Sequence, residues 1–234
     1  MDRTVLITGA TGTVGRVVAE TFAQTGARLA VTGRRESALQ ALAGVLSLPD
    51  ERLLVMPADL ADSKNVLALV SAIDARWGGV DVLLNVAGGW RGGSRVADLK
   101  EPEWDAILDM NLRSAFLINR AVLPHMVEQR WGRIVNFGSR AVVSPGAKQV
   151  AYNVAKSGVV ALTQSISSDY RRRGVAANVV LPAIIDTPQN REGSPDADHT
   201  RWVPPGDLAE LLLFLASDAG GSLNGASIPV FAQL

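Results

Sequence analysis

The chain has 234 residues, which suits one large domain or two small ones, and its 47% hydrophobic content allows a sizeable buried core. Its 23 basic and 23 acidic residues cancel, so charge gives no reason to expect nucleic acid or an anionic membrane as a partner. The absence of cysteine excludes disulfides, thiol nucleophiles and cysteine-bound metals. No stretch reaches the roughly 18 apolar residues of a membrane helix. We therefore expect a cytoplasmic protein without a membrane partner.

Apolar segments rich in branched residues alternate with segments of helical period along the chain. This alternation predicts parallel strands joined by right-handed helical crossovers. No change in composition marks a linker, so we predict one α/β domain over residues 1–234, a Rossmann-type doubly wound parallel sheet in three α/β/α layers. The predicted strands are Val5–Thr8, Leu29–Thr32, Leu53–Met56, Val80–Asn85, Arg133–Phe137, Ala177–Leu181 and Ser227–Val230.

The segment 186–207 breaks this rhythm, with four prolines and no clear period. It follows the sixth predicted strand at its carboxyl end, where open α/β sheets bind ligands. Long irregular loops at such places are usually functional. We therefore predict a substrate loop here, with a disordered insertion as the alternative.

A glycine-rich turn follows the first predicted strand and leads into a helix predicted over Val14–Gln24. Glycines let the backbone turn sharply and approach a pyrophosphate, whose charge is met by free N–H groups at the helix N-terminus. The order strand, turn, helix favours a dinucleotide site over a plain turn. The residues predicted to contribute are Thr8, Gly9, Gly12, Thr13, Val14 and Gly15.

The second predicted strand ends in Gly33-Arg34-Arg35. A dinucleotide without a 2′-phosphate would favour an acidic residue here, to bind the ribose hydroxyls. Guanidinium groups instead suit forked binding of a phosphate. The sequence therefore predicts NADP(H) rather than NAD(H) as cofactor, held by Arg34 and Arg35. The alternative is that the two arginines begin a solvated helix.

Tyr152 and Lys156 stand four residues apart in a predicted helix, Tyr152–Arg172, and so share one face. A free phenol titrates near pH 10, but a nearby ammonium and an oxidised nicotinamide favour phenolate and lower its pKa. In the reductive direction the same tyrosine would act as an acid. Ser139 follows the fifth strand and lies 13 residues before Tyr152. Its hydroxyl could donate to the substrate oxygen, or only cap a turn.

The chain resembles the classical short-chain dehydrogenase/reductase family over essentially its whole length. The resemblance implies a catalytic tetrad, in which Lys156 also binds the ribose hydroxyls and Asn111 anchors a water in the proton relay. The matching segments are the glycine turn, Asp59-Leu60, Asn85-Val-Ala-Gly88, Asn111, Ser139, Tyr152 with Lys156, and 178–187. The implied tetrad is Asn111, Ser139, Tyr152 and Lys156.

The resemblance also implies further cofactor contacts and an assembly. Asp59 and Leu60 would border the adenine; the cofactor floor would be Asn85, Ala87 and Gly88; and the carboxamide side would be Pro182, Ile185 and Thr187. A homotetramer or homodimer would pair through helices predicted at 103–125 and 152–172. The chain departs from the family at Thr13, Val86 and Ala183, where glycine, asparagine and glycine are usual.

Two segments, 86–93 and 181–202, are similar to dihydropteridine reductase. Trp90 could stack on a flat heterocycle such as a pterin, or close with Trp202 as a lid over a ketone. Ser139 and Arg34 argue against the pteridine alternative, because those enzymes lack the serine and prefer NADH. The predicted substrate residues are Trp90, Ser139, Arg140 and Trp202.

The leading prediction is thus an NADP-dependent reductase of carbonyl substrates, of the 3-oxoacyl or ketone type. A dihydropteridine or quinonoid-type reductase is second. A non-catalytic dinucleotide sensor is third, since a sensor has no need of Tyr152 and Lys156 together. Two isolated histidines without carboxylate spacing predict no metal site.

Overall fold

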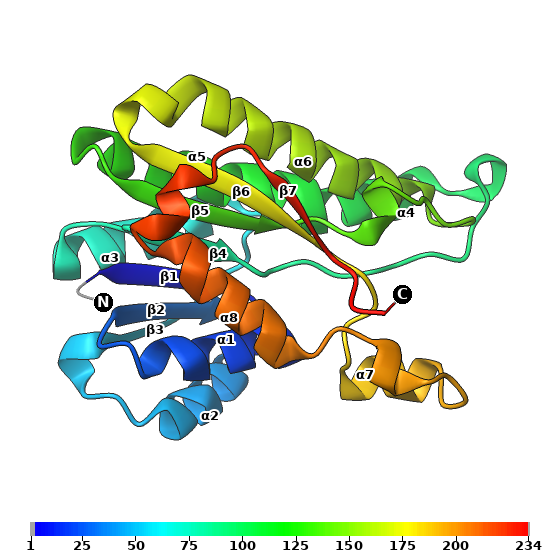
Figure 1. The fold of residues 1–234 in the computed structure, drawn as a ribbon, viewed down its shortest axis with the longest axis horizontal. Coiled ribbons are helices and arrows are strands. Elements are labelled where there is room, and N and C mark those ends of the chain that lie inside the picture. The colour runs from blue at the N-terminus through cyan, green and yellow to red at the C-terminus, as the bar shows by residue number, and fades with distance from the viewer. Residues whose placement is uncertain (1–2, 234) are drawn as a thin grey trace.

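The computed structural model describes residues 3–233, which form a seven-stranded parallel sheet with helices on both faces (Figure 1). This confirms the predicted fold class. The spatial order is β3-β2-β1-β4-β5-β6-β7, so the chain reverses its direction of travel across the sheet between β1 and β4. Ligands bind at such switch points, beyond the carboxyl ends of the strands. The strands are β1 Thr4–Thr8, β2 Arg28–Gly33, β3 Leu53–Pro57, β4 Val82–Asn85, β5 Gly132–Phe137, β6 Val175–Pro182 and β7 Ser227–Val230.

Helices cover both faces of the sheet because successive strand side chains point to opposite sides. Val5 and Ile7 pack with α1, α2 and α8 on one face, and Leu6 packs with α3 and α5 on the other. In Figure 1, α6 lies with α5 on this second side. The helices are α1 Thr13–Ala23, α2 Glu36–Leu46, α3 Ser63–Trp77, α4 Glu101–Leu108, α5 Ser114–Glu128, α6 Val150–Tyr170, α7 Pro188–Gly193 and α8 Pro205–Ala216.

The helix expected over 103–125 is interrupted by a wider turn. A π-helical segment, Asp109–Arg113, joins α4 to α5 and contains the predicted catalytic Asn111. The Asn111 side chain donates to the Ile107 carbonyl one turn earlier, at 3.1 Å. Single π turns inside helices occur frequently at functional sites. Hydrophobic periodicity does not reveal one extra residue in a turn, so the sequence pattern predicted a plain helix.

The segment 186–207 is more ordered than its composition indicated. It contains α7, a short 3-10 turn at His199–Arg201 and the start of α8. The Thr187 hydroxyl accepts from the Asn190 N–H at 3.2 Å, and proline occupies the first turn of α7, where no N–H is needed. An isolated bridge between Ile185 and Val203 ties the two ends of the segment together. A six-residue helix is too short to produce a recognisable period.

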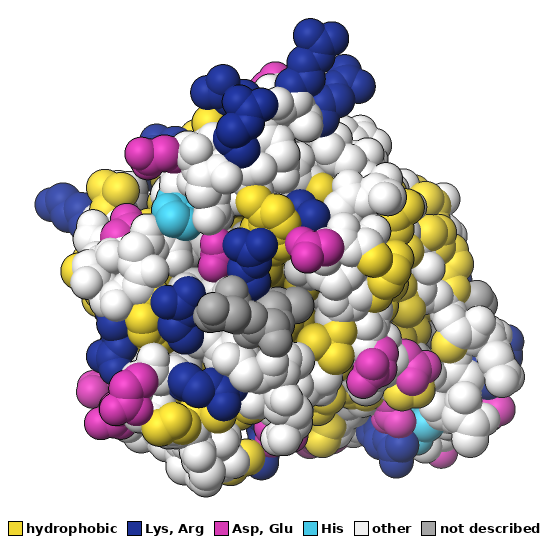
Figure 2. Space-filling model, turned by 60° about the vertical axis from the view of Figure 1, so that its left-hand side comes forward, with side chains coloured by type: hydrophobic (Ala, Val, Ile, Leu, Met, Phe, Trp, Pro, Cys, Tyr) yellow, Lys and Arg dark blue, Asp and Glu magenta, His cyan; other side chains and the backbone are white. Residues whose placement is uncertain are grey.

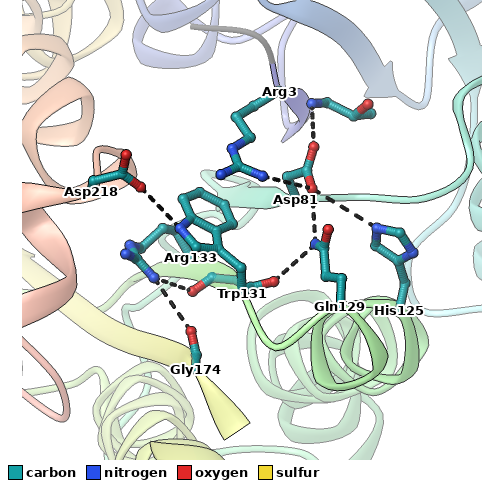
Figure 3. Close-up of polar contacts among 10 residues, drawn as sticks. Arg3, Asp81, His125, Gln129, Trp131, Arg133, Gly174 and Asp218 are labelled. Atoms are coloured by element: carbon teal, nitrogen blue, oxygen red, sulfur yellow. Dashed lines mark hydrogen bonds and ion pairs between the residues drawn. The ribbon is translucent and has the colours of Figure 1, made fainter.

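The amino edge of the sheet, opposite the predicted site, carries its own polar cluster (Figure 3). Asp81 accepts from the Thr4 N–H and the Gln129 amide, both at 2.8 Å, and its carboxylate faces Arg3 and His125 at 3.8 and 3.9 Å. Beside it, the Trp131 ring lies between two guanidinium groups, those of Arg3 and Arg133, and its indole N–H donates to Asp218. These contacts join the amino ends of β1, β4 and β5.

Figure 2 shows the side of the molecule that lies to the left in Figure 1. Basic and acidic side chains are interspersed over this face, and hydrophobic side chains gather toward the right of the view. Among the helices of residues 3–233, none is both long and apolar enough to span a bilayer. The same residues hold no cluster of three or more potential metal ligands.

Candidate active site

The carboxyl ends of β1 and β4 are joined by side-chain hydrogen bonds at the switch point. Thr8 pairs in register with Asn85, and its hydroxyl donates to the Asn85 side-chain oxygen at 2.8 Å. The same hydroxyl accepts from the Ala87 N–H at 3.1 Å. The glycine turn that follows β1 is therefore attached directly to the loop that follows β4.

Two glycines at this edge allow close contacts that any side chain would prevent. Gly9 has a positive φ of 63°, and a Cβ there would lie 2.9 Å from the Ala87 backbone. Gly88 has φ 154°, and a Cβ there would lie 2.9 Å from Asn111 Oδ1 and 3.2 Å from Lys156 Nζ. Such bare backbone beside the N-terminus of α1 suits a dinucleotide pyrophosphate. Thr13, the departure from the usual glycine, is exposed as the first residue of α1 and does not fill the turn.

The predicted adenine and phosphate residues lie along the same edge, farther from β4. Arg34 and Arg35 are exposed just after β2, next to Gly33, where a Cβ would lie 3.0 Å from the Thr11 hydroxyl. After β3, Leu60 is buried, whereas Asp59 is exposed and accepts from the Ala61 N–H at 3.0 Å. The structure thus places Arg34 and Arg35, both exposed, directly after β2; their contact with a phosphate stays a prediction.

Helix α6 places Tyr152 and Lys156 at the carboxyl end of β5, close to Ser139. The Ser139 hydroxyl lies close enough to the Tyr152 phenol to lower its pKa. Lys156 is buried, donates to the Phe137 carbonyl oxygen at 2.8 Å and lies 5.9 Å from the centre of the Tyr152 ring. The Ser139 hydroxyl also accepts from the Ala141 N–H at 3.1 Å. Ser139 therefore caps the following turn and lies close to Tyr152 at the same time.

Burial dominates the ionisation of both groups. It raises the pKa of the Tyr152 phenol, while the nearby Ser139 hydroxyl lowers that pKa. It also lowers the pKa of Lys156 to about 8. The direction for Tyr152 is thus opposite to the predicted lowering, because burial disfavours the phenolate more than the nearby Ser139 hydroxyl favours it. The protein alone therefore offers a protonated phenol beside an ammonium, the state that carbonyl reduction requires.

The Asn111 side chain is paired with the loop that follows β4. Its amide donates to the Gly89 carbonyl and accepts from the Gly89 N–H, both at 3.1 Å, and the residue is almost fully buried. The two bonds hold the backbone at Gly88 and Gly89 against α6. Asn111 thus lies in the same cluster as Lys156, and its part in a water relay stays a prediction.

The structure treats the predicted substrate residues differently. Trp90 is 65% exposed and its indole N–H donates to the Gln149 amide oxygen at 2.9 Å, three residues before Tyr152. Arg140, directly after Ser139, is partly buried. Trp202 is 4% exposed, with its ring centre 4.4 Å from that of His199. Trp202 stands directly before Val203, which pairs with Ile185, and its ring is buried; a contact of Trp202 with substrate stays a prediction.

The expected carboxamide residues lie between β6 and α7. Pro182 ends β6, and Ile185 and Thr187 follow it on the way into α7. The Asn190 amide donates to the Ile185 carbonyl at 2.8 Å, and Thr187 caps the helix. Asp186 and Arg191 form a paired ion bridge at 2.6 and 2.7 Å that stiffens the same turn.

Some residues of the site were not predicted. Gln149 binds Trp90, the Phe137 carbonyl binds Lys156, and Gly89 binds Asn111. The last two act through backbone atoms, which every residue carries, so no residue type could have marked them. Gln149 stands next to the predicted helix, and only the folding of the 89–95 loop shows its partner.

Comparison with known proteins agrees with this geometry. The family model for short chain dehydrogenases matches residues 3–198. The chain belongs to the short-chain dehydrogenase family. It is 35% identical over 233 residues to the hydroxy(phenyl)methylsuccinyl-CoA dehydrogenase subunit BbsD of Thauera aromatica, covering 96% of this chain and 93% of that one. It is 34% identical to the 3-oxoacyl-(acyl-carrier-protein) reductase FabG of Escherichia coli, covering 96% and 94%.

Solved structures give the same result. The structure of gox2181 superposes with a TM-score of 0.91 at 26% identity, covering 98% of this chain and 94% of that one. A Bacillus thuringiensis structure, provisionally described as a 3-oxoacyl-reductase, gives 0.87 at 28% identity, covering 98% and 97%. This short-chain dehydrogenase is therefore an NAD(P)-dependent oxidoreductase of carbonyl and alcohol groups. The comparisons favour neither the pteridine reductase nor the sensor alternative.

Proposed function

We propose that this short-chain dehydrogenase is an NADP-dependent reductase of 3-oxoacyl or related ketone substrates, with Tyr152 as the proton-transfer group. The observation that carries the proposal is the cluster at the end of β5, where the Ser139 hydroxyl lies close to the Tyr152 phenol and Lys156 is buried beside the ring. A phenol and a second hydroxyl directed at one place can share a carbonyl oxygen. Such a pair stabilises the charge that develops on that oxygen.

The roles of the individual side chains follow from their surroundings. When bound, the nicotinamide dinucleotide supplies the hydride or accepts it. In reduction, Tyr152 donates its proton to the carbonyl oxygen while the Ser139 hydroxyl donates a hydrogen bond to it. The Lys156 ammonium, close to the ring, stabilises the phenolate that forms. Asn111 holds the Gly89 backbone in place through two hydrogen bonds, and Gly88, without a side chain, lies close to both Asn111 and Lys156.

The dinucleotide would be held along the edge from β3 to β6. The glycine turn and the α1 N-terminus would take the pyrophosphate, Lys156 the ribose hydroxyls, and the segment from Pro182 to Thr187 the carboxamide. Arg34 and Arg35, exposed after β2, support NADP(H) as the preferred form because forked guanidinium groups match a phosphate.

The substrate class is inferred from two relatives and from the entrance of the site. BbsD is named as a dehydrogenase of a substituted succinyl-CoA, and FabG as a reductase of a 3-oxoacyl thioester of a carrier protein. A coenzyme A or carrier-protein thioester would place a long arm outside the cleft. Trp90, held over the start of α6 by Gln149, would form one wall for the acyl part, with Arg140 beside Ser139. The 186–207 segment would form the other wall.

The decisive experiment compares Tyr152→Phe with Tyr170→Phe, the only other tyrosine of the chain. Both variants are assayed with NADPH against simple ketones, 3-oxoacyl thioesters and a quinonoid dihydropterin. Tyr152→Phe should lower kcat by about 10²–10⁴-fold while dinucleotide affinity stays within about twofold of the wild type, because only proton transfer is removed. Tyr170→Phe should behave as the wild type. Full activity in Tyr152→Phe would show that another group carries the proton. Turnover of the dihydropterin and of no other substrate would instead support the dihydropteridine reductase alternative.

We also propose that the protein is cytoplasmic and forms a homotetramer or homodimer. The subunits would pair through α6 and through the helical segment from α4 to α5. Phe116 on α5 and Val154 on α6 are large apolar side chains that stay 44% and 43% exposed. Burying such side chains favours association. Analytical ultracentrifugation of the wild type and of Phe116→Glu with Val154→Lys tests the pairing; a monomer in both would contradict it.

A further inference from the structure

A buried asparagine at the centre of the sheet uses its entire hydrogen-bonding capacity. The Asn136 side-chain oxygen accepts from the Asn85 and Asn119 amides, each at 2.9 Å, and its own amide donates to Thr163 at 3.0 Å and to Asn119 at 3.3 Å. An amide has two donors and two acceptor lone pairs, so none is left unused. The residue is fully buried in β5. It thus joins a strand on one side to two helices on the other.

The partners of Asn136 lead to both halves of the candidate site. Asn85 accepts from Thr8, which stands directly before the glycine turn. Thr163 lies on α6, seven residues after Lys156, and therefore on the same helical face about 10 Å farther along. Asn119 lies on α5, two turns after Asn111. The Asn136 amide thus links the glycine-turn side of the site, through Asn85, to the helix that carries Tyr152 and Lys156, through Thr163.

Helix α6 is consequently fixed to β5 by polar contacts at two points along its length. Lys156 Nζ donates to the Phe137 carbonyl, and two turns later Thr163 Oγ1 accepts from Asn136. The close approach of Ser139 to Tyr152 crosses the same boundary, since Ser139 follows β5 and Tyr152 belongs to α6. Apolar packing is non-directional, whereas hydrogen bonds specify one alignment of the two elements. A small rotation or slide of α6 would separate the two hydroxyl groups.

We propose that Asn136 is a positioning residue, which through Thr163 holds α6 in the alignment that brings the Tyr152 phenol against the Ser139 hydroxyl. It touches none of the reacting atoms and acts only through the elements it joins. The inference rests on the proposed function, because it takes Tyr152 as the proton-transfer group. A misplacement of about 1 Å at a reacting group can cost on the order of 10²-fold in rate, so a remote hydrogen bond can be felt at the site.

The test uses Thr163→Val, because Asn136→Ala would leave several buried polar groups without partners and would endanger folding. Valine has nearly the shape of threonine but lacks the hydroxyl. In Thr163→Val, Asn136 therefore keeps its hydrogen bonds to Asn85 and Asn119 and loses only its hydrogen bond to α6. Thr21→Val on α1 is the matched control, since both hydroxyls donate to the carbonyl four residues earlier, Thr163 at 2.7 Å and Thr21 at 2.9 Å. We expect Thr163→Val to lower kcat about tenfold with an unchanged KM for NADPH, Thr163→Ser to restore kcat, and Thr21→Val to match the wild type.

A second readout does not require turnover. In a Tyr170→Phe background Tyr152 is the only tyrosine, so NMR of ¹³Cζ-labelled tyrosine follows its ionisation alone. The nearby Ser139 hydroxyl lowers the pKa of Tyr152, so loosening α6 should move the titration to higher pH in Thr163→Val and leave it in place in Thr21→Val. An unmoved titration with unchanged kcat, and only a lower Tm, would make the network purely structural and overturn the inference. A wild type that reduces no carbonyl would refute the proposed function instead, while the titration would still decide the role of Asn136.

Discussion

Lys156 donates a hydrogen bond to the carbonyl oxygen of Phe137, with 2.8 Å between the two atoms. The carbonyl belongs to the last residue of β5, two positions before Ser139, so the strand that presents the serine also holds the lysine. The ammonium is buried, and burial lowers its pKa to about 8. A cation that titrates so near neutrality is sensitive to pH in the range where the enzyme is assayed.

This lowered pKa has a consequence for stability. Lys156 titrates near 8 when folded but near 10.4 when unfolded, so between these values the unfolded chain binds more protons than the folded one. The free energy of unfolding should therefore rise as pH goes from 8 to 10, because the cost of burying the ammonium disappears. Urea unfolding without added dinucleotide should show a rise of up to about 3 kcal/mol that is absent in Lys156→Met. Lys148→Met, which alters an exposed lysine, should keep it. Parallel curves for wild type and Lys156→Met would contradict the assignment.

Gly88 offers a direct test of the space beside the tetrad. A Cβ there would approach Asn111 Oδ1 to 2.9 Å and Lys156 Nζ to 3.2 Å, and φ of 154° disfavours any side chain. Gly88→Ala should lower dinucleotide affinity and kcat by at least about tenfold, since the Asn111–Gly89 pairing must shift. Gly93→Ala is the control, with φ of 129° but no neighbour within 4 Å of its Cβ. Equal effects of the two substitutions would mean that backbone strain alone, not the contact with the tetrad, decides.

The arginines after β2 predict how the cofactors are discriminated. Arg34→Ala should raise the KM for NADPH by about tenfold and leave the KM for NADH within twofold, because only the phosphate contact is lost and a charge-assisted contact contributes roughly 1.5 kcal/mol. Arg35→Ala should act in the same direction. Arg120→Ala, an exposed arginine on α5, serves as control. If Arg34→Ala changed the KM for NADPH and the KM for NADH equally, the two arginines would only begin a solvated helix. The predicted preference for NADP(H) would then be wrong.

The Trp90–Gln149 hydrogen bond predicts coupling at the entrance. Gln149→Met should release the indole and raise the KM for a 3-oxoacyl thioester several-fold, while kcat and the KM for NADPH change less. Trp90→Phe keeps a ring and removes the N–H, so it should produce a similar effect. The double variant is the control: the losses should not add, because both substitutions break the same bond. Additive losses in the cycle would show that each residue acts separately.

The fold could be predicted because the strands are buried on both faces and read as short apolar runs. Leu6 and Ile7 face opposite layers, and both are fully buried, so period and burial agree. What the pattern missed depends on single residues. The π turn at Asn111 adds one residue to a helical turn. Helix α7 has only six residues, and it depends on the Thr187 cap and on Pro188 in its first turn. Neither changes the hydrophobic periodicity.

The candidate site shows the same division. Tyr152, Lys156 and Ser139 were predicted as a group, because a spacing of four in a helix and the end of a strand are geometric facts. Their surroundings could not be, since burial controls the pKa of Lys156 and only the folded chain defines it. Trp202 was expected to face a ligand and is buried, because tryptophan is equally suited to lids and to cores.

The last prediction concerns the opposite edge of the sheet. Asp81 is 7% exposed, accepts from Thr4 and Gln129, and faces Arg3 and His125 (Figure 3). Asp81→Asn keeps the shape but removes the charge and one acceptor, so it should lower the free energy of unfolding by about 1–3 kcal/mol. Because these contacts lie at the amino ends of the strands, kcat and both KM values should stay within twofold of the wild type. Asp98→Asn, an exposed aspartate, is the control for stability. A fall in kcat without a fall in stability would instead mean that this cluster communicates with Tyr152 across the sheet.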